Sequence, residues 1–413
     1  MQKSFMIIGI DASRAFLKNR TGIEEYSFQI IKNLRNKLEK EKVILYLRPK
    51  KKDEKEVYYR NKVGRIKIRD EKTGRSFVLP QNWRIKVIKL PRFWTQIGLS
   101  WEMLIRPVDV LFVPAHTVPV INPGSFLSKI VGRLRRRRKM LGRTVVTIHG
   151  LEYEFLSKAY SAWEKFYMHW SIKKSCRWAT EIIAVSENTK KDLMRLYKIP
   201  AQKIAVIYEG VHNITSKEKK ENKLPADLES VIKHHKYLLF VGRIEQRKNI
   251  SGIIQAFETL KDKYKISHKL ILVGGFGYGY GEIVNKIEDS KYKDEIFLTG
   301  YLDETKKQEI LKNADMFLFP TFYEGFGLPI LEAQSVGVPV VASDSSAVPE
   351  IVGEELKPFL VNPSEPKDIA QIIYKILTND GLRKKLISAG YKNTKRFCWS
   401  GCAGSVANVI LKS

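Results

Sequence analysis

The chain alternates short apolar runs with longer segments in which apolar residues recur at helical spacing. This alternation predicts an α/β protein with two doubly wound parallel sheets. Residues 48–80 are charged and less regular, so we expect a mobile loop or a small hairpin there. In the first half, strands are predicted over residues 5–11, 43–47, 108–113, 144–148 and 181–185, and helices over 22–37 and 187–197, the second capped by Ser186.

A charged segment at residues 217–223 is the predicted linker between two domains. The first domain would cover residues 1–223 and the second residues 224–396. A chain of 413 residues, 44% of them apolar, is long enough to bury two cores. No run of about 18 apolar residues is present, and the first residues lead directly into a strand, so we expect neither a spanning helix nor a signal peptide. The expected location is therefore the cytoplasm.

The segment from Pro320 to Glu332 carries the most informative chemistry. It follows an apolar strand and passes through two glycines into a helix, where Pro329 suits the first turn. Glu324 would project from the loop, and Glu332 would lie about one turn inside the helix. Because open α/β sheets bind ligands at the carboxyl ends of their strands, the two acids are placed to contact different parts of one extended ligand, such as a sugar nucleotide. An ordinary loop with a solvated Glu is the alternative for this segment alone.

A second segment, Leu238 to Ile250, predicts a phosphate-binding loop. Its apolar strand breaks at Gly242, and two spaced cations, Arg243 and Lys248, precede a helix. The guanidinium offers a planar fork of donors, the ammonium is a compact charge, and the free N–H groups of the helix also favour anions. In a chain this basic, a solvated basic loop is the alternative.

Together these segments resemble the carboxyl-terminal half of a retaining glycosyltransferase of family 4, which has the GT-B fold. The resemblance spans most of the chain, more strongly over residues 200–355 and more loosely before them. It implies two Rossmann-like domains facing across a cleft, an N-terminal one for the acceptor and a C-terminal one for the nucleotide sugar. It also implies a terminal helix at 397–413 that packs back on the first domain. Further motifs that carry it are Ile8-Gly-Ile-Asp11, Thr21-Gly22-Ile-Glu-Glu-Tyr26, Val145-Val-Thr-Ile-His149, Val206-Ile-Tyr-Glu-Gly210, Leu272-Val-Gly274-Gly275, Leu298-Thr-Gly300, Gly337-Val-Pro339 and Val348-Pro349-Glu350.

The resemblance implies a role for each residue around the donor. Arg243 and Lys248 would stabilise the diphosphate as it leaves. Glu324 would contact the donor sugar near the reacting centre, and Glu332 would bind the ribose hydroxyls. Gly22 would give the diphosphate room to approach. The other implied donor residues are Gly242, Gly274 and the backbone N–H groups of Gly325, Phe326, Gly327 and Leu328.

His149 follows an apolar strand and matches the histidine that faces the donor sugar in this family, where it would donate or accept a hydrogen bond. A structural histidine is the alternative. His116 and Tyr26 are expected on the acceptor side. The chain departs from common family patterns at two places, because Gly22 stands where a glycine pair is usual and Gly150 stands where Asp is frequent.

The predicted reaction moves a hexose from a GDP-mannose-like or UDP-sugar donor to a glycan or lipid-linked acceptor, in cell-surface polysaccharide or glycolipid synthesis. Retention of anomeric configuration is implied by the resemblance. The absence of an Asp-x-Asp triplet favours catalysis without a metal ion. No other cofactor is expected. The alternatives are a GT-B phosphorylase, a sugar-nucleotide epimerase, or a protein that only binds anionic surfaces.

The formal net charge of +29 requires an anionic partner. A basic cluster at Lys129 to Lys139, and further basic residues interleaved with Trp83, Phe93, Trp94 and Trp101, suit the surface of an anionic membrane. A solvated basic loop, with the Trp residues in the core, is the alternative. No segment resembles a nucleic-acid module, so no nucleic acid is expected. The three cysteines lack metal-ligand spacing and are expected to be buried thiols.

Overall fold

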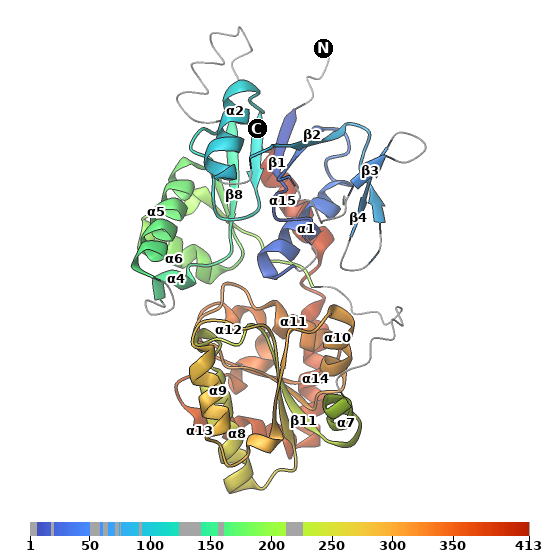
Figure 1. Cartoon of the computed structure of the whole chain (residues 1–413), viewed down its shortest axis with the longest axis vertical. Coiled ribbons are helices and arrows are strands. Elements are labelled where there is room, and N and C mark those ends of the chain that lie inside the picture. The colour runs from blue at the N-terminus through green and yellow to red at the C-terminus, as the bar shows by residue number, and fades with distance from the viewer. Residues whose placement is uncertain are drawn as a thin grey trace. The chain divides into compact units, whose positions relative to one another are not determined.

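The computed structural model describes residues 6–17, 20–49, 58–60, 65–70, 74, 76–90, 93–123, 142–155, 161–211 and 226–412. The chain forms two compact units (Figure 1). The first consists of Met1–Leu151, Ala162–Gly210 and Trp399–Ser413, and the second of Glu152–Ser161 and Val211–Cys398. The expected linker at 217–223 lies outside the described residues.

The first unit is built on seven parallel strands in the order β10-β9-β8-β7-β1-β2-β6. Its central strands are almost entirely buried, as expected of a parallel sheet covered on both faces. The strands are β1 (Ile7–Asp11), β2 (Lys42–Leu47), β6 (Trp83–Val87), β7 (Val110–Val113), β8 (Arg143–Ile148), β9 (Glu181–Ala184) and β10 (Ile204–Val206).

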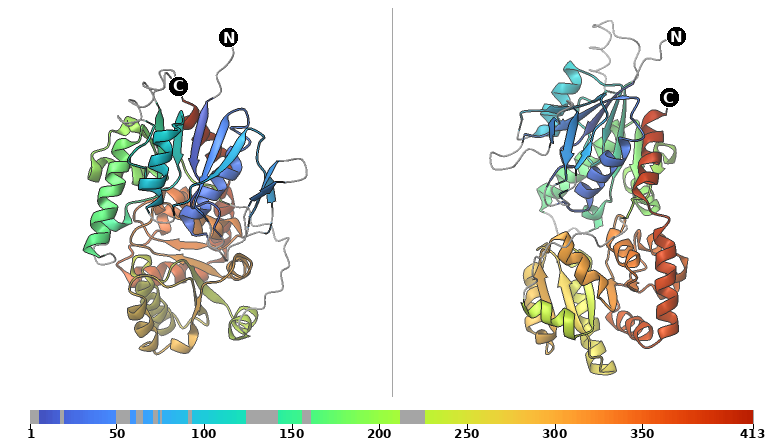
Figure 2. Two further views of the ribbon diagram at one scale, coloured as in Figure 1. Left: turned by 45° about the horizontal axis from the view of Figure 1, so that its top comes forward. Right: turned by 90° about the vertical axis from the view of Figure 1, so that its right-hand side faces the viewer.

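Helices from both ends of the chain cover this sheet. The terminal helix α15 (Trp399–Leu411) packs against α1 (Gly22–Leu34), and Figure 2 shows them as neighbouring red and blue helices. Arg143 Nη2 donates to the Val409 carbonyl oxygen at 2.9 Å, which ties α15 to the edge of β8. The other helical elements are η1 (Trp94–Leu99), α2 (Ser100–Ile105), α5 (Ala162–Trp178), α6 (Glu187–Tyr197) and η2 (Ala201–Lys203).

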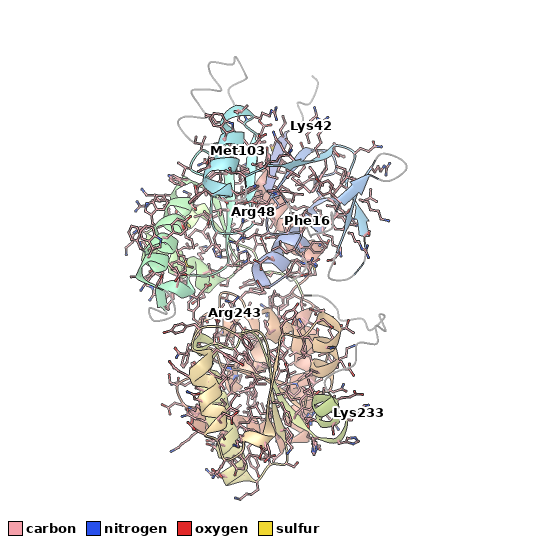
Figure 3. The ribbon with its side chains drawn as sticks, in the orientation of Figure 1. Phe16, Lys42, Arg48, Met103, Lys233 and Arg243 are labelled. Carbon is pink, nitrogen blue, oxygen red and sulfur yellow. The ribbon has the colours of Figure 1, made fainter. Side chains whose placement is uncertain are left out.

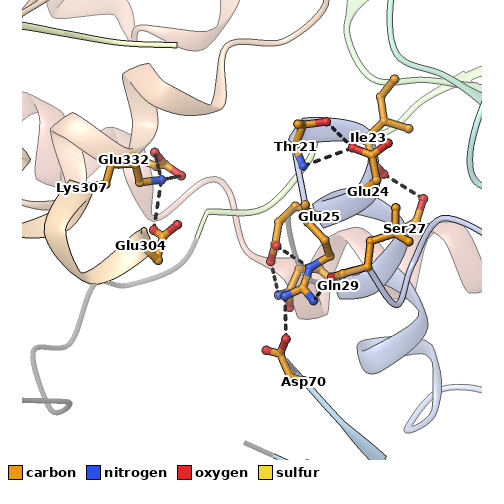
Figure 4. A network of polar contacts seen from close by, with 12 residues as sticks. Thr21, Ile23, Glu24, Glu25, Ser27, Gln29, Asp70, Glu304, Lys307 and Glu332 are labelled. Carbon is orange, nitrogen blue, oxygen red and sulfur yellow. Dashed lines mark hydrogen bonds and ion pairs between the residues drawn. The ribbon is translucent and has the colours of Figure 1, made fainter. Parts of the chain in front are cut away.

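The described part of 48–80 contains a small antiparallel sheet, one strand more than the expected hairpin. Its strands are β3 (Tyr58–Arg60), β4 (Ile66–Arg69) and β5 (Ser76–Val78). Arg20 anchors it to α1, because its buried guanidinium pairs with Asp70 at 2.7 Å and with Glu25 at 2.9 Å (Figure 4).

The second unit is built on five parallel strands in the order β13-β12-β11-β14-β15. They are β11 (Tyr237–Val241), β12 (Lys269–Val273), β13 (Ile296–Gly300), β14 (Met316–Phe319) and β15 (Val340–Ala342). The helical elements are α4 (Glu152–Phe155), α7 (Ala226–His234), η3 (Gln246–Lys248), α8 (Ile250–Tyr264), α9 (Tyr280–Glu288), η4 (Lys293–Glu295), α10 (Glu304–Lys312), α11 (Leu328–Ser335), α12 (Val348–Ile351), η5 (Glu354–Phe359), α13 (Pro366–Leu377) and α14 (Asp380–Thr394). The predicted pair of parallel α/β sheets is confirmed.

Candidate active site

Gly242 and Gly274 lie where the ends of β11, β12 and β13 come into close backbone contact. The Gly242 N–H donates to the Val273 carbonyl, and the Gly274 N–H donates to the Gly300 carbonyl, both at 2.9 Å. A Cβ atom on Gly274 would lie 1.6 Å from the Gly242 carbonyl oxygen, and its φ of +153° is also unfavourable for other residues. Glycine is therefore required at 274 to shape this edge of the sheet.

The loop after β14 is fastened to the short turn η3. The Phe322 N–H donates to the Arg247 carbonyl at 3.0 Å, and Arg247 Nη1 donates to the Tyr323 carbonyl at 3.0 Å. Asn249, which has a φ of 57° and caps α8, donates to the Pro320 carbonyl at 3.0 Å. These bonds hold the end of β14 and the start of α8 together as one rigid platform.

Four charged side chains form a cluster on this platform. The Lys248 ammonium donates to Glu324, and Arg247 lies 3.4 Å from the same carboxylate oxygen. Arg247 also donates to Glu245 at 2.7 Å. The side chains of Lys248 and Glu324 are 8% and 17% exposed, so both charges are largely removed from water. Two cations face two carboxylates, and the cluster is electrically balanced.

The electrostatic effects within the cluster oppose one another. Burial would raise the pKa of Glu324, but Lys248 and Arg247 together lower it below its usual range. Burial and the adjacent Arg247 lower the pKa of Lys248, and Glu324 offsets part of this effect. The Glu324 carboxylate is therefore held in its ionised form.

Arg243 lies outside this cluster. It is exposed on the loop that follows β11, and its aliphatic stem runs beside Gly277 (Figure 3). Its guanidinium makes no ion pair with any residue that the structure describes. The structure thus joins Lys248 to Glu324 and leaves Arg243 open to a ligand. Arg247, which sequence reasoning passed over, takes the inner position.

Glu332 is held on α11 by a lysine from α10. Lys307 Nζ lies 3.2 and 3.0 Å from the two Glu332 oxygens and 3.1 Å from Glu304 (Figure 4). Burial would lower the pKa of Lys307, but the two carboxylates raise it above its ordinary value. Glu332 is 27% exposed and keeps a face open to solvent.

Gly325 to Leu328 form the turn into α11. Gly327 has a φ of +111°, which favours glycine, and Pro329 lies in the first turn of the helix as predicted. The Phe326 side chain is buried and packs edge-on against Phe397. The backbone of this turn, rather than its side chains, is what a ligand would meet.

His149 in the first unit has both ring nitrogens engaged. Nε2 lies 2.8 Å from the Pro114 carbonyl oxygen, and Nδ1 lies 3.1 Å from Glu209 Oε1. A carbonyl oxygen can only accept, so Nε2 must carry a proton. Nδ1 faces a carboxylate oxygen, and the side chains of His149 and Glu209 are 8% and 4% exposed. His149 is thus held between a backbone carbonyl and Glu209, a partner that the sequence did not indicate.

The rings of Tyr26 and His116 both pack against His149. Tyr26 is fully buried, with its ring 4.6 Å from that of His149 and its hydroxyl 3.2 Å from Thr147. It therefore supports His149 and does not reach a surface. The His116 ring lies 5.4 Å from His149, and its Nδ1 finds no hydrogen-bond partner among the described residues. Burial, reinforced by His149 and Arg14, lowers the pKa of His116 well below its ordinary value, so it is neutral.

Gly22 begins α1, directly after the capping residue Thr21. No described heavy atom lies within 4 Å of the position where its Cβ would be. The amino end of α1 is therefore open on this side.

Of the residues expected to contact a membrane, some are exposed, and others are buried or lie outside the described residues. The cluster from Lys129 to Lys139 lies outside the described residues. Trp83 and Trp94 are buried core residues, contrary to the expectation of exposed aromatics. Trp83 is the first residue of β6, and its indole N–H donates to the Leu38 carbonyl at 3.2 Å. Phe93 and Trp101 are exposed. None of the described helices combines the length and apolar character needed to cross a membrane.

Two further expectations concern cysteines and metals. Cys176 and Cys402 are buried as expected, whereas Cys398 is exposed at the point where the chain leaves the second unit. Over the ranges that the structure describes, no three His, Cys, Asp or Glu side chains gather as a metal site. Catalysis without a metal remains a prediction.

Comparisons with known proteins cover both units. The family model described as Glycosyl transferases group 1 matches residues 227–393, and that described as Glycosyltransferase Family 4 matches residues 21–213. The O-antigen chain mannosyltransferase B of Escherichia coli is 30% identical over 269 residues, covering 65% of this chain and 70% of that protein. The capsular polysaccharide biosynthesis glycosyltransferase CapM of Staphylococcus aureus is 27% identical over 288 residues, covering 67% of this chain and 71% of that protein. The crystal structure of Anabaena HepE with UDP and glucose aligns with 99% of this chain and 100% of that one, at a TM-score of 0.66 and 17% identity.

Proposed function

Because this chain is a family 4 glycosyltransferase of the GT-B fold, we propose that it moves a hexose from a nucleotide sugar to a glycan or lipid-linked acceptor, with retention of configuration and without a metal ion. Mannose is the first donor sugar we propose, because a relative 30% identical to this chain is named as a mannosyltransferase of O-antigen chains. That name and the CapM name also support a place in the synthesis of cell-surface polysaccharide.

The charge cluster on η3 and the loop after β14 is the observation that carries the proposal. A nucleoside diphosphate is a dianion or more, and it would meet Arg243 and Lys248 at the carboxyl ends of β11 and β14. Glu324 pairs with the ammonium of Lys248. An incoming diphosphate would replace Glu324 as the partner of Lys248, and the released carboxylate would turn to the hydroxyls of the donor sugar.

The same groups would act on the transition state. Negative charge accumulates on the diphosphate as the bond between the anomeric carbon and oxygen breaks. Preorganised cations at that position stabilise the developing charge by several kcal/mol. Glu332, held by Lys307 but still partly exposed, would bind the ribose hydroxyls. The turn from Gly325 to Leu328 would present backbone N–H groups to the sugar.

Competition between Glu324 and the diphosphate provides the test. Glu324→Gln should lower transfer at least about tenfold but should not weaken binding of GDP or UDP, because an uncharged amide holds the Lys248 ammonium less strongly than the carboxylate does. Lys248→Met should weaken nucleotide binding and transfer together. Lys312→Met, which removes an exposed lysine at the end of α10, is the matched control and should change neither. Equal loss of nucleotide affinity in Glu324→Gln and Lys248→Met would contradict the proposed exchange of partners.

A donor screen then identifies the reaction. Binding of GDP, UDP and their sugar conjugates is measured first by thermal shift, since a ligand at 100 times its Kd stabilises the folded state by about 2.7 kcal/mol. The best donor is incubated with acceptor glycans, and NMR of the product reports its anomeric configuration. Sugar release that depends on phosphate would indicate a phosphorylase, and conversion of the donor without an acceptor would indicate an epimerase. Inversion of configuration would refute the retaining mechanism.

Contact with an anionic membrane at the cytoplasmic face is the last part of the proposal. On α5, the exposed side chains Trp163, Phe166, Tyr167 and Trp170 follow one helical face, opposite the buried Ile172 and Cys176. Such a face can rest at the headgroup level of a bilayer. Flotation with phosphatidylglycerol vesicles should retain the protein, and the double variant Trp163→Ser/Trp170→Ser should lose this retention. Equal flotation of the variant and the wild type would remove α5 from the contact.

A further inference from the structure

The first unit contains a cavity of about 270 Å³ that includes none of the predicted donor residues. It lies at the carboxyl ends of β1, β2 and β7, the edge of a parallel sheet at which ligands bind. Its charged lining consists of Asp11 after β1, Arg14 in the following turn, and Arg48 after β2.

The two arginines are available to a ligand. Arg48 is exposed, its guanidinium lies 5.5 Å from the centre of the Trp94 ring, and it forms no ion pair with any described residue (Figure 3). Arg14 is 51% exposed and has one long contact, with Glu24 at 3.5 Å. Asp11 is only 8% exposed and accepts from the Ser13 N–H at 3.0 Å. Planar guanidinium groups in such positions suit the oxygens of phosphate.

The cavity shares a wall with His149. Pro114 lines the cavity, and its carbonyl oxygen is the group that Nε2 of His149 contacts at 2.8 Å. The neighbouring Ala115 and Thr117 also line it, and the His116 between them packs against His149. A molecule in this cavity therefore lies next to the residue expected at the reacting centre. This is the position that an acceptor needs.

The rim of the cavity is apolar. Phe93 is 73% exposed, has a φ of +53°, and directly precedes the π-helical turn η1. A bulky residue in the left-handed region and a π-helix both recur at functional sites. Tyr167, 46% exposed, lines the cavity from the other side and belongs to the aromatic face of α5. An apolar path thus leads from the cavity to Phe166, Trp163 and Trp170.

From this juxtaposition we propose that the cavity is the acceptor subsite and takes the phosphate or diphosphate group of a lipid-linked glycan. Arg48 and Arg14 bind the phosphate oxygens, and the lipid chain leaves over Phe93 and Tyr167 along α5. The inference rests on the proposed transferase function and names the acceptor class for it.

Binding is tested first, without any transfer. Hexyl diphosphate, methyl diphosphate and hexyl glucoside are titrated by calorimetry, the alkyl compounds below the concentration at which they form micelles. The wild type should bind hexyl diphosphate more tightly than either of the others. Arg48→Gln should weaken that binding at least about tenfold, since a hydrogen bond to a charged group is lost. Arg84→Gln, which removes an exposed arginine of β6 outside the cavity, is the matched control and should bind like the wild type.

The lipid part is tested separately. Tyr167→Ser should weaken binding of hexyl diphosphate and leave methyl diphosphate unchanged. If Arg48→Gln weakens binding of hexyl diphosphate and Tyr167→Ser does not, the phosphate that binds here belongs to a soluble phosphorylated acceptor. The lipid part of the proposal is then wrong. If Arg48→Gln and Arg84→Gln bind hexyl diphosphate equally, the subsite is wrong.

Transfer assays distinguish this inference from the proposed function. With a lipid diphosphate glycan as acceptor, Arg48→Gln should raise KM at least about tenfold and leave the affinity for the nucleotide donor unchanged. With a neutral alkyl glycoside, its KM should equal that of the wild type. Equal KM increases for both acceptors would overturn the inference while the transferase function stands. Absence of nucleotide-sugar binding in the wild type would instead overturn the proposed function, and the role of this cavity as an acceptor site with it.

Discussion

Replacing Lys248 with Met should destabilise the second unit by about 2 kcal/mol. Removal of one member of a buried ion pair costs about 3–5 kcal/mol, whereas an exposed pair contributes about 0–1 kcal/mol. Lys248 and Glu324 are 8% and 17% exposed, which places the pair near the buried limit. Arg247 remains 3.4 Å from Glu324 after the substitution and keeps the carboxylate partly compensated. The expected cost therefore lies between the two limits.

A double-mutant cycle isolates the interaction itself. Glu324→Gln alone should cost about 1–2 kcal/mol, because the amide oxygen can still accept from Lys248. The double variant should cost less than the sum of the two single variants by about 1–2 kcal/mol, as expected for residues in direct contact. Lys312→Met again serves as the control and should fall within about 0.5 kcal/mol of the wild type.

The seven tryptophans make the assay specific for one unit. All of them, from Trp83 to Trp399, belong to the first unit. Tryptophan fluorescence therefore reports unfolding of the first unit, and calorimetry reports both. Lys248→Met should lower the Tm of the calorimetric transition that fluorescence does not follow, by about 4–8 °C for a domain of this size. Strictly additive costs, or a shift confined to the fluorescence transition, would refute the energetic coupling of Lys248 to Glu324.

Four further predictions follow from the structure. Gly274→Ala should destabilise the second unit by more than about 3 kcal/mol, because its Cβ would lie 1.6 Å from a carbonyl oxygen, whereas Gly275→Ala, with open space around it, should be tolerated in the same calorimetric measurement. NMR of ¹⁵N-labelled histidines should show a ring N–H at Nε2 of His149, which faces a carbonyl oxygen, and Glu209→Gln should shift the Nδ1 resonance; an Nε2 without a proton would contradict this arrangement. The folded-state pKa of Glu324 is lowered, so its contribution to stability is present above its ordinary value of 4.5 and is lost as the pH falls through the folded value. The acid-induced fall in Tm should therefore be shallower in Glu324→Gln than in the wild type. Transfer should persist in EDTA, and its complete loss with recovery on adding Mg²⁺ or Mn²⁺ would contradict metal-independent catalysis.

The strands and caps could be predicted because their signals are local. An apolar run bounded by polar residues predicts a buried parallel strand wherever it falls, and the structure forms β14 and β11 at the apolar runs that precede Pro320 and Gly242. Ser186 accepts from the Thr189 N–H at 3.0 Å, as its position before the helix predicted. The expectation that Trp83 and Trp94 lie at the surface was wrong. Their alternation with basic residues shows only that charged residues flank them along the chain. Burial of these two rings depends on neighbouring elements far away in the sequence.

The partners of the charged residues could not be predicted from local patterns. Arg247 lies in the short turn η3, which the left-handed Asn249 follows, and its guanidinium lies 3.4 Å from Glu324. The spacing of Arg243, Arg247 and Lys248 in the sequence does not show which of them contacts this carboxylate. Lys307 precedes Glu332 by 25 residues on another helix, and no short motif links them. The chain has 73 Lys and Arg residues, so each carboxylate has many possible partners. The packing of helices and strands decides which of them it meets, and spacing in the sequence does not.

Most ionisable residues of the candidate site are paired within the protein. Lys248 is paired with Glu324, Glu332 with Lys307, and His149 with Glu209, so most of the ionisable side chains expected at the donor already have an internal partner. A ligand that engages them must replace or share those partners, and its affinity is the difference between the new and the old interactions. In exchange, each side chain is held in place before the ligand arrives, which reduces the entropy lost on binding. Removal of the internal partner should therefore separate binding from transfer, because the freed group binds more tightly while its orientation in the transition state is lost.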